Sequence, residues 1–175
     1  MFGFRRQDPQ AESARRLHDA LTARARAPVF YTRFLVADTI DGRFDLLALH
    51  ASLLMDALGC EGEAGRAVGT HLATQIFAGF DTALRELGVS DAGMSRRIRA
   101  LADAFYGRLD AYRTADSADD LAAALSRNLY RGELVRAGEA RALAEYVAGA
   151  RAALASGRAS PTLLRGEVDF GPLPA

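Results

Sequence analysis

The chain is 175 residues long, with 22 basic and 22 acidic residues and one cysteine, Cys60. This length fits a single domain, and the balanced charge favours neither nucleic acid nor an acidic partner, so no DNA partner is expected. A lone cysteine excludes an internal disulfide and a cysteine-based zinc cluster, which suits a reducing compartment. No stretch reaches the roughly 18–20 apolar residues of a membrane helix, and the first residues soon become polar, unlike a signal peptide. We therefore expect a cytoplasmic protein with only peripheral membrane contact.

The first predicted helix covers residues 10–27 and follows a flexible N-terminus of residues 1–9. Ala14, Leu17 and Leu21 share one face of this helix, at the spacing of an amphipathic helix. The chain up to its end carries six arginines against three acidic residues. A solvated helix face explains this excess, and weak attraction to anionic lipid or ribosomal RNA is the alternative.

The stretch from Phe30 to Leu58 organises the rest of the chain. Residues 29–36 form an apolar run that is too short for periodicity to separate helix from strand. Because no other segment could pair with it as a strand, we favour a short buried helix. Residues 38–42 then have turn composition, and Asp38 or Thr39 can cap the helix that follows. That helix is apolar on two sides, which predicts that it packs between neighbours as the central helix.

Four more helices, each with one broad apolar face, follow at residues 66–87, 94–113, 117–131 and 138–156. Gly69 and Gly79 lie inside the first of these, and we expect close helix–helix approach at both. The predicted fold class is therefore all-α, a single-domain helical bundle of about six to seven helices with no sheet. The helical domain is expected to span residues 10–159 and to be followed by a C-terminal tail of residues 160–175.

Asp38, Asp41 and Asp45 suggest a metal or phosphate-activating site, as in a helical enzyme acting on isoprenoid or lipid substrates. Such a site needs a second acidic set on an opposing helix, and capping explains Asp38 and Asp41 without a metal. The sequence has no P-loop, dinucleotide-binding or serine hydrolase motif. We expect no catalytic residue, no metal and no cofactor, and we keep the helical enzyme as the alternative.

Three further polar residues lie among apolar ones. His50 shares a narrow polar stripe with Arg43; a half-buried, hydrogen-bonded histidine is expected, and acid–base catalysis is the alternative. Arg108 and Asn128 lie at the edge of, or within, apolar stripes, and they need partners if they are buried. We expect an internal network for both, with partner recognition as the alternative.

Arg96, Arg97 and Arg99 crowd the start of a predicted helix. Cations there oppose the helix dipole, so they do not serve helix stability. Solvation of the three side chains explains them, and a binding partner is the alternative.

Several segments, in order along residues 28–150, together resemble the ubiquinol–cytochrome c chaperone family, which comprises assembly factors for the cytochrome bc complex. The most specific segment is residues 38–47, DTIDGRFDLL. The others are Phe30-Tyr31, Leu49-His50, Asp81, residues 83–91 (ALRELGVSD), residues 104–108 (AFYGR) and residues 127–130 (RNLY).

This resemblance implies an all-helical, non-enzymatic assembly chaperone. It would bind cytochrome b, nascent or newly inserted, and support assembly of the ubiquinol–cytochrome c reductase complex of the respiratory chain. The resemblance also implies peripheral association with the inner (cytoplasmic) membrane. Because mitochondrial members work with a small helper protein and at the ribosome, both are candidate partners here, and a homodimer is a further alternative.

We expect the client to bind the aromatic segment around Phe30, Tyr31 and Phe34, with Arg43 and His50 nearby. The predicted partner-binding residues combine this segment with polar and aromatic residues of the family-like stretches: Phe30, Tyr31, Phe34, Asp38, Arg43, Asp45, His50, Tyr106, Arg108 and Asn128.

Overall fold

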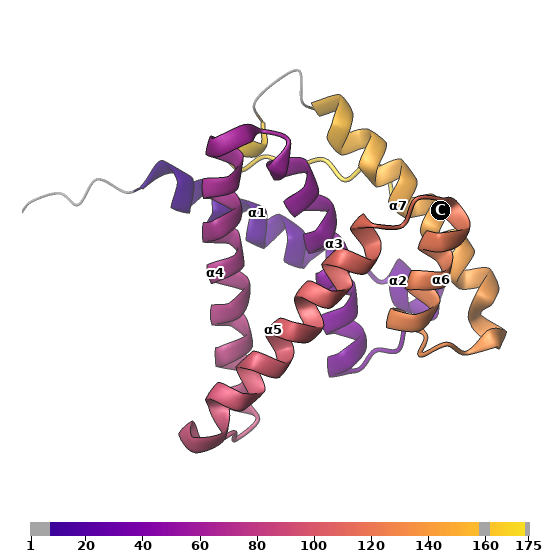
Figure 1. Cartoon of the computed structure of the whole chain (residues 1–175), viewed down its shortest axis with the longest axis horizontal. Helices are drawn as coiled ribbons and strands as arrows, with labels where there is room; N and C mark the ends of the chain where they lie inside the picture. Colours follow the sequence, from indigo (N-terminus) through magenta and orange to yellow (C-terminus); the bar gives the residue numbers. More distant parts are fainter. Residues whose placement is uncertain (1–7, 158–161, 174–175) are drawn as a thin grey trace, which may run out of the picture.

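A computed structural model describes residues 8–157 and 162–173, which form α-helices and two short 3-10 turns, with no strand among them (Figure 1). The all-α prediction is confirmed. The predicted flexible segment 1–9 falls mostly on residues 1–7, outside the described part. The elements are α1 (Pro9–Ala25), α2 (Val29–Thr32), α3 (Ile40–Gly59), α4 (Gly62–Glu86), α5 (Asp91–Arg113), α6 (Ala118–Leu129), η1 (Leu134–Arg136), α7 (Ala137–Ser156) and η3 (Leu163–Arg165).

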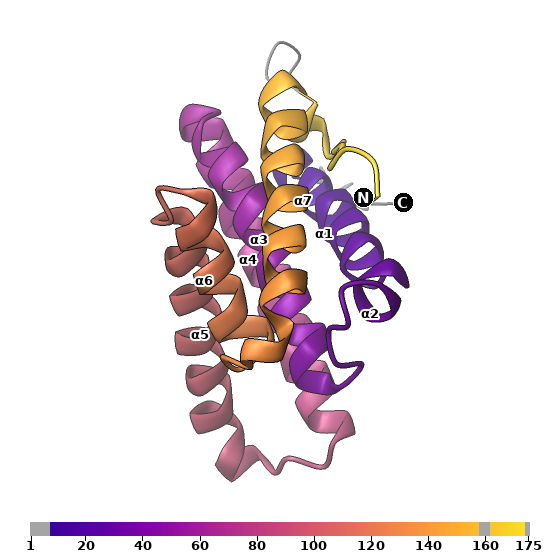
Figure 2. The ribbon, with the colours of Figure 1, turned by 90° about the vertical axis from the view of Figure 1, so that its right-hand side faces the viewer.

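Helix α3 is the axis of the molecule, as its two apolar faces predicted. It contacts α1, α4, α5, α6 and α7, and Figure 2 shows it between α4 and α7. Leu46, Leu49 and Leu53 are buried from one stripe, and Leu54 and Leu58 from the other. A helix buried on two sides removes apolar surface from water against several neighbours at once, which fixes the positions of those neighbours around it.

Residues 29–32 of the apolar run before α3 form the one-turn helix α2, in which Phe30 is buried. The predicted short buried helix is therefore confirmed only for this first half of the run, and residues 33–36 are not helical. After it, Leu35 adopts a left-handed backbone conformation (φ 53°) and the chain turns toward α3. Thr39 caps α3, because its hydroxyl oxygen accepts a hydrogen bond from the Gly42 amide at 3.1 Å. Asp38 instead pairs with Arg43 at 2.7 Å on the surface. Of the two candidate caps, Thr39 therefore fills the role.

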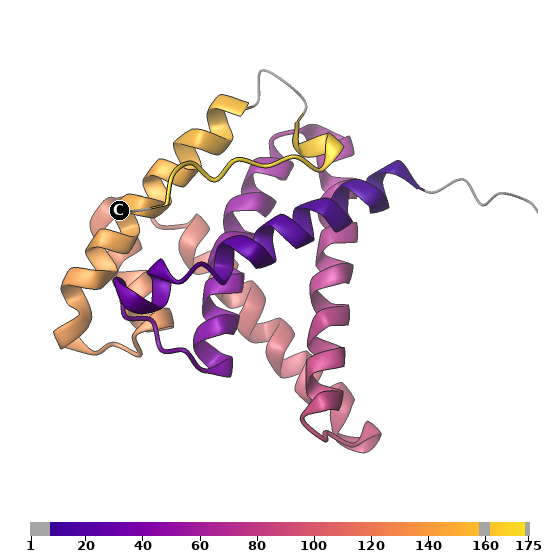
Figure 3. The same ribbon diagram turned by 180° about the vertical axis from the view of Figure 1, so that it is seen from behind.

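Helices α4 and α5 form a long hairpin whose two arms diverge from a tip that projects away from the other helices (Figures 1 and 3). The start predicted for α4, at residue 66, is too late. Gly62 has a positive φ of 68° and lets the chain reverse within a few residues of the end of α3. The connection between α3 and α4 is therefore shorter than the predicted start at residue 66 implies.

The residues after α7 return along the molecule. Figure 3 shows residues 162–173 running between α7 and α1. The Ser13 hydroxyl donates to the Leu164 carbonyl at 2.7 Å, and Leu163 and Phe170 are buried. Arg24 donates to the Phe170 and Gly171 carbonyls at 3.2 and 2.6 Å. This segment is therefore packed on the helices.

Glycine at position 65 is required by the close approach of α4 to the end of α3. A Cβ atom there would collide with the Leu58 carbonyl oxygen, which is backbone and cannot yield cheaply. We expect Gly65→Ala to lower the free energy of unfolding by about 2 kcal/mol, the usual scale of overpacking. Gly79→Ala is the control, since a Cβ atom there meets nothing within 4 Å; it should raise stability by up to about 1 kcal/mol. Urea unfolding of both variants tests this pair, and equal effects would contradict it.

The prediction of close helix approach at Gly69 and Gly79 is wrong for Gly79. A Cβ atom at Gly69 would come within ordinary contact of the Met55 sulfur, at 3.6 Å. The tight contact lies one turn earlier, at Gly65, where α4 leaves α3.

Candidate partner-binding site

A buried carboxylate joins three of the segments that the sequence had singled out. Asp45, on α3, is fully buried. The Arg108 Nε of α5 donates to its Oδ1 at 2.8 Å, and the Arg131 Nη1, just after α6, lies 2.9 Å from its Oδ2. Burial raises the pKa of the Asp45 carboxyl, and the two guanidinium groups act in the opposite direction. The internal network expected for Arg108 is therefore present, and it connects α3, α5 and the end of α6.

Arg131 reaches this carboxylate from an unusual backbone. It has a positive φ of 54° and is followed by Gly132 with φ 77°, so the chain turns sharply as α6 ends. Its guanidinium also donates to the Asn128 carbonyl and lies 3.9 Å from Asp41. Sequence reasoning missed Arg131; its only signal was its place directly after the family-like RNLY segment.

Tyr112 is buried close enough to the same ion pairs to feel their charges. Its hydroxyl is buried and has no hydrogen-bond partner among the described residues. Burial, and next the negative charge of Asp45, raise the pKa of this phenol. Tyr112 therefore stays neutral and donor-competent close to the charged pair.

A pocket of about 370 Å³ lies beside Arg131. Its walls are the loop between α2 and α3 on one side and the end of α6 with η1 on the other. The Tyr130 hydroxyl ties the walls together by donating to the Phe34 carbonyl at 2.7 Å. The lining residues are Leu35, Ala37, Thr39, Asp41, Gly42, Leu129, Tyr130, Arg131, Glu133 and Arg136.

Large exposed apolar side chains lie on the segments that form the walls of this pocket. Leu35, Ile40, Leu134 and Val135 are between 41% and 90% exposed. Leu35 lines the pocket, and each of the other three is adjacent in sequence to a residue that does. We call these four residues the apolar rim. Clustered exposed apolar side chains mark interaction surfaces, whereas scattered ones do not.

The aromatic residues predicted to face the client lie elsewhere. Phe30 and Phe34 are buried, and Tyr31 is partly buried with its hydroxyl 3.3 Å from the Ala25 carbonyl. The rings pack on the core side, where Phe30 contacts His50 and Tyr146 at centroid distances of 5.0 and 5.3 Å. Phe30 and Phe34 are therefore core anchors, and the exposed apolar residues come just after them.

His50 is also buried, more completely than its half-buried prediction, and away from Arg43. Its Nδ1–H donates to the Leu46 carbonyl at 2.8 Å, because a carbonyl can only accept. Its Nε2 therefore accepts from the Tyr146 hydroxyl at 2.9 Å, and that oxygen accepts from Arg24 at 2.9 Å. Burial lowers the pKa of His50 to about 4. His50 is a neutral structural link between α3, α7 and α1.

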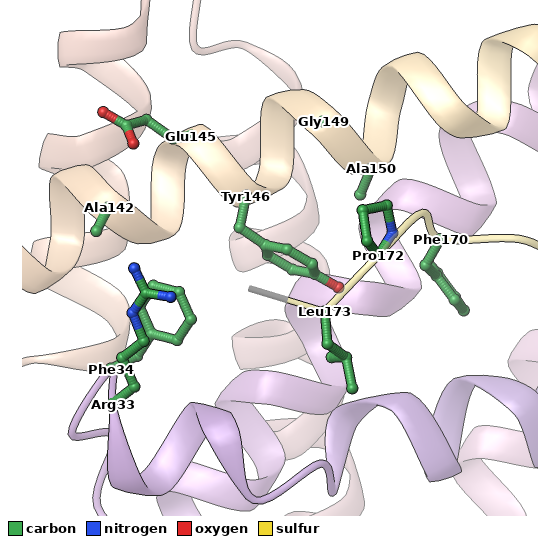
Figure 4. A pocket seen from close by; sticks show the side chains of 10 residues that line it. All are labelled: Arg33, Phe34, Ala142, Glu145, Tyr146, Gly149, Ala150, Phe170, Pro172 and Leu173. Atoms are coloured by element: carbon green, nitrogen blue, oxygen red, sulfur yellow. The ribbon is translucent and has the colours of Figure 1, made fainter. Parts of the chain in front are cut away.

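A second pocket, of about 420 Å³, lies beside this histidine network. Figure 4 shows Tyr146 between Arg33 and Phe34 on one side and the tail residues Pro172 and Leu173 on the other. Part of its wall is therefore the chain's own C-terminal segment. Among the described residues, Leu173 is the one exposed large apolar side chain that lines it.

The remaining predicted residues do not share one site. Tyr106 is exposed on α5 and contacts Phe77 and Phe105 at centroid distances of 5.9 and 5.4 Å. The Asn128 side chain donates to the Ala124 carbonyl at 3.0 Å within its own helix. The ion pair of Asp38 and Arg43 is solvent-exposed. Fold geometry therefore brings Asp45, Arg108 and Asn128 near Arg131, and leaves Tyr106 and this surface ion pair apart.

The aspartates do not form the site that the alternative enzyme requires. Asp38 and Asp41 are exposed near the start of α3, and Asp45 points to two arginines. In residues 8–157 and 162–173, no group of three or more His, Cys, Asp or Glu side chains could hold a metal ion. The three carboxylates therefore have neither a shared cavity nor an opposing acidic set.

Comparison with known proteins supports the resemblance found in the sequence. The model of the ubiquinol–cytochrome C chaperone family matches residues 32–170. Ubiquinol-cytochrome-c reductase complex assembly factor 1 of Xenopus laevis is 24% identical over 163 residues, which cover 92% of this chain and 82% of that protein. The crystal structure of the Cbp3 homolog from Brucella abortus superimposes with a TM-score of 0.83 at 34% identity, covering 93% of this chain and 92% of that one. The chain therefore belongs to the ubiquinol–cytochrome c chaperone family.

Proposed function

We propose that this chain binds newly made cytochrome b through the apolar rim and the pocket beside Arg131, and that it acts without chemistry of its own. Family membership makes it an assembly chaperone of the ubiquinol–cytochrome c reductase complex. Cytochrome b as the client, and action at the cytoplasmic membrane, are our proposals. The observation that carries them is that exposed leucine, isoleucine and valine side chains lie on the two segments that line one pocket.

The rim suits a segment of a membrane protein that is apolar and ends in polar groups. Each apolar side chain that a client covers contributes roughly 1.5–3 kcal/mol when fully removed from water. Arg131 and Arg136 lie beside Asp41 and Glu133 in the pocket, so charges of both signs are available to orient the polar end. Binding of this kind is reversible, which lets the client leave once it is assembled.

None of the described helices has the combination of length and apolar composition needed to cross a membrane. Contact with the membrane, as we propose it, is therefore made by the surface of these helices.

The test is co-purification of cytochrome b with the tagged full-length protein from its native membranes. The double variant Leu134→Asp with Val135→Asp should reduce the recovered cytochrome b at least about tenfold, since two apolar contacts are lost. Leu173→Asp is the matched control, because Leu173 is also an exposed leucine but lines the second pocket. It should leave recovery unchanged.

Equal recovery with the double variant and the wild type would contradict the proposal. A homodimer that uses the same rim is a distinct outcome, and it would appear as a change in the solution mass of the double variant. Thermal unfolding of each variant tests whether the fold is retained. We expect that it is, because the substituted side chains are exposed in the native state.

A further inference from the structure

The tip of the α4–α5 hairpin, residues 85–99, carries positive charge that the fold does not use. Arg96, Arg97 and Arg99 are exposed, and none forms an ion pair with a described residue. Over these residues the chain has four arginines against two acidic residues, a net charge of +2 in a chain that is neutral overall. The three arginines lie beyond the first turn of α5, which begins at Asp91, so the helix dipole does not account for their charge.

Nearby acidic groups neutralise little of this charge. Asp81 and Asp91 are both held by Arg85, at 2.8 and 2.9 Å. Glu86 is exposed on the last turn of α4, and Asp103 is exposed one turn beyond Arg99. The guanidinium groups of Arg96, Arg97 and Arg99 therefore stay available to an external anion.

An apolar side chain lies at the turn of the same hairpin. Leu87, the residue directly after α4, is 59% exposed, and Gly88 follows with a φ of 78°. Figures 1 to 3, which share one vertical axis, show the tip as the lowest part of the molecule. The loops that carry the apolar rim lie in the same lower half, and the C-terminal tail lies in the upper half.

We propose that this hairpin tip docks the protein on a bilayer of anionic phospholipid, with Leu87 in the interfacial layer and Arg96, Arg97 and Arg99 on the headgroup phosphates. Docking in this orientation turns the apolar rim toward the bilayer, where a membrane client is exposed. The orientation of the rim toward a client rests on the proposed function. Binding of the hairpin tip to lipid does not, because it needs no client. An exposed leucine at the apex favours lipid over RNA, because a bilayer offers an apolar layer beneath its anionic surface.

The experiment is co-sedimentation of the full chain with vesicles made from equal parts of phosphatidylcholine and phosphatidylglycerol, and with vesicles of phosphatidylcholine alone. We expect binding to the anionic vesicles only. The triple variant R96Q/R97Q/R99Q should bind about 100-fold more weakly, since each cation near an anionic surface contributes roughly 1 kcal/mol. The control R26Q/R66Q/R141Q removes the same charge from exposed positions outside the tip and should bind within about threefold of wild type.

Leu87→Trp gives an independent readout, because the chain contains no tryptophan. Its fluorescence should shift to the blue when anionic vesicles are added, and that of Leu173→Trp should not. If the two triple variants lost vesicle binding equally, only the net charge of the protein would matter, and the proposal would be overturned. Equal binding of the wild type to neutral and anionic vesicles would also overturn it. So would a variant R96Q/R97Q/R99Q that loses binding to ribosomal RNA but keeps binding to vesicles.

The two proposals can fail separately. The rim variant with Leu134→Asp and Val135→Asp should keep full vesicle binding. In detergent, R96Q/R97Q/R99Q should keep full binding to solubilised cytochrome b. A loss of vesicle binding in the rim variant would contradict the assignment of lipid contact to the tip.

Discussion

Asp45→Asn is expected to lower the free energy of unfolding by about 3 kcal/mol, because it removes the charge that two arginines share inside the protein. Arg108 donates to Asp45 at 2.8 Å and is itself mostly buried, so it cannot turn to water without leaving the bundle. Arg131 is more exposed and can partly recover hydration. The cost therefore arises mainly at Arg108, between α3 and α5.

The matched control for this variant is Asp38→Asn, which removes a carboxylate of another ion pair seven residues earlier. Asp38 pairs with Arg43 at 2.7 Å, but both side chains are exposed. Exposed ion pairs contribute little because water solvates the separated charges nearly as well. Guanidinium unfolding at neutral pH should therefore show a large loss for Asp45→Asn and a far smaller one for Asp38→Asn. Similar losses would mean that the Asp45 pairs are not shielded from water.

Acidification from pH 7 to pH 4 should remove about 3 kcal/mol of stability through His50 alone. The folded pKa of His50 is lowered from 6.5 to about 4 by burial. The unfolded chain therefore takes up the proton first as the pH falls. The stabilisation is complete above about pH 6.5 and is lost progressively toward pH 4.

His50→Gln isolates this effect, because glutamine does not titrate. Between pH 7 and pH 4 the variant should lose less unfolding free energy than the wild type, and the difference should equal the His50 contribution. This holds even if the variant is less stable than the wild type at both pH values. In NMR spectra the imidazole of His50 should titrate with a midpoint near 4. A midpoint near 6.5 would show that the ring is hydrated, and would contradict its hydrogen bonds to Leu46 and Tyr146.

The long helices α1 and α3–α7 could be predicted from the sequence, because each has a regular apolar face, but not all of their ends could be. The central position of α3 followed from apolar residues on two of its sides. The start of α4 could not be read, since glycine marks both long connections and the tight reversal made by Gly62. Which glycine meets a neighbouring helix, Gly65 and not Gly79, depends on tertiary distances that periodicity does not contain.

The candidate site was harder to predict than the fold. The family-like segments contain Asp45, Arg108 and Asn128, which the fold brings close together, but they gave no sign of the contact of Asp45 with Arg131. The sequence of an apolar run such as residues 29–36 does not tell whether its aromatic side chains are buried in the core or exposed to solvent. In the structure Phe30 and Phe34 are buried. The exposed rim combines residues about 95 positions apart, such as Ile40 and Leu134, and only the fold brings their loops to one pocket.

Site-specific photocrosslinking tests the central claim, that the apolar rim contacts newly made cytochrome b, most directly. A photoreactive phenylalanine analogue is placed at Leu134 in one variant and at Leu173 in another, and crosslinks are identified after a pulse of cytochrome b synthesis in the native cells. We predict a crosslink to cytochrome b from position 134 and none from position 173. A crosslink from position 173 and none from position 134 would contradict the account and move the client to the second pocket.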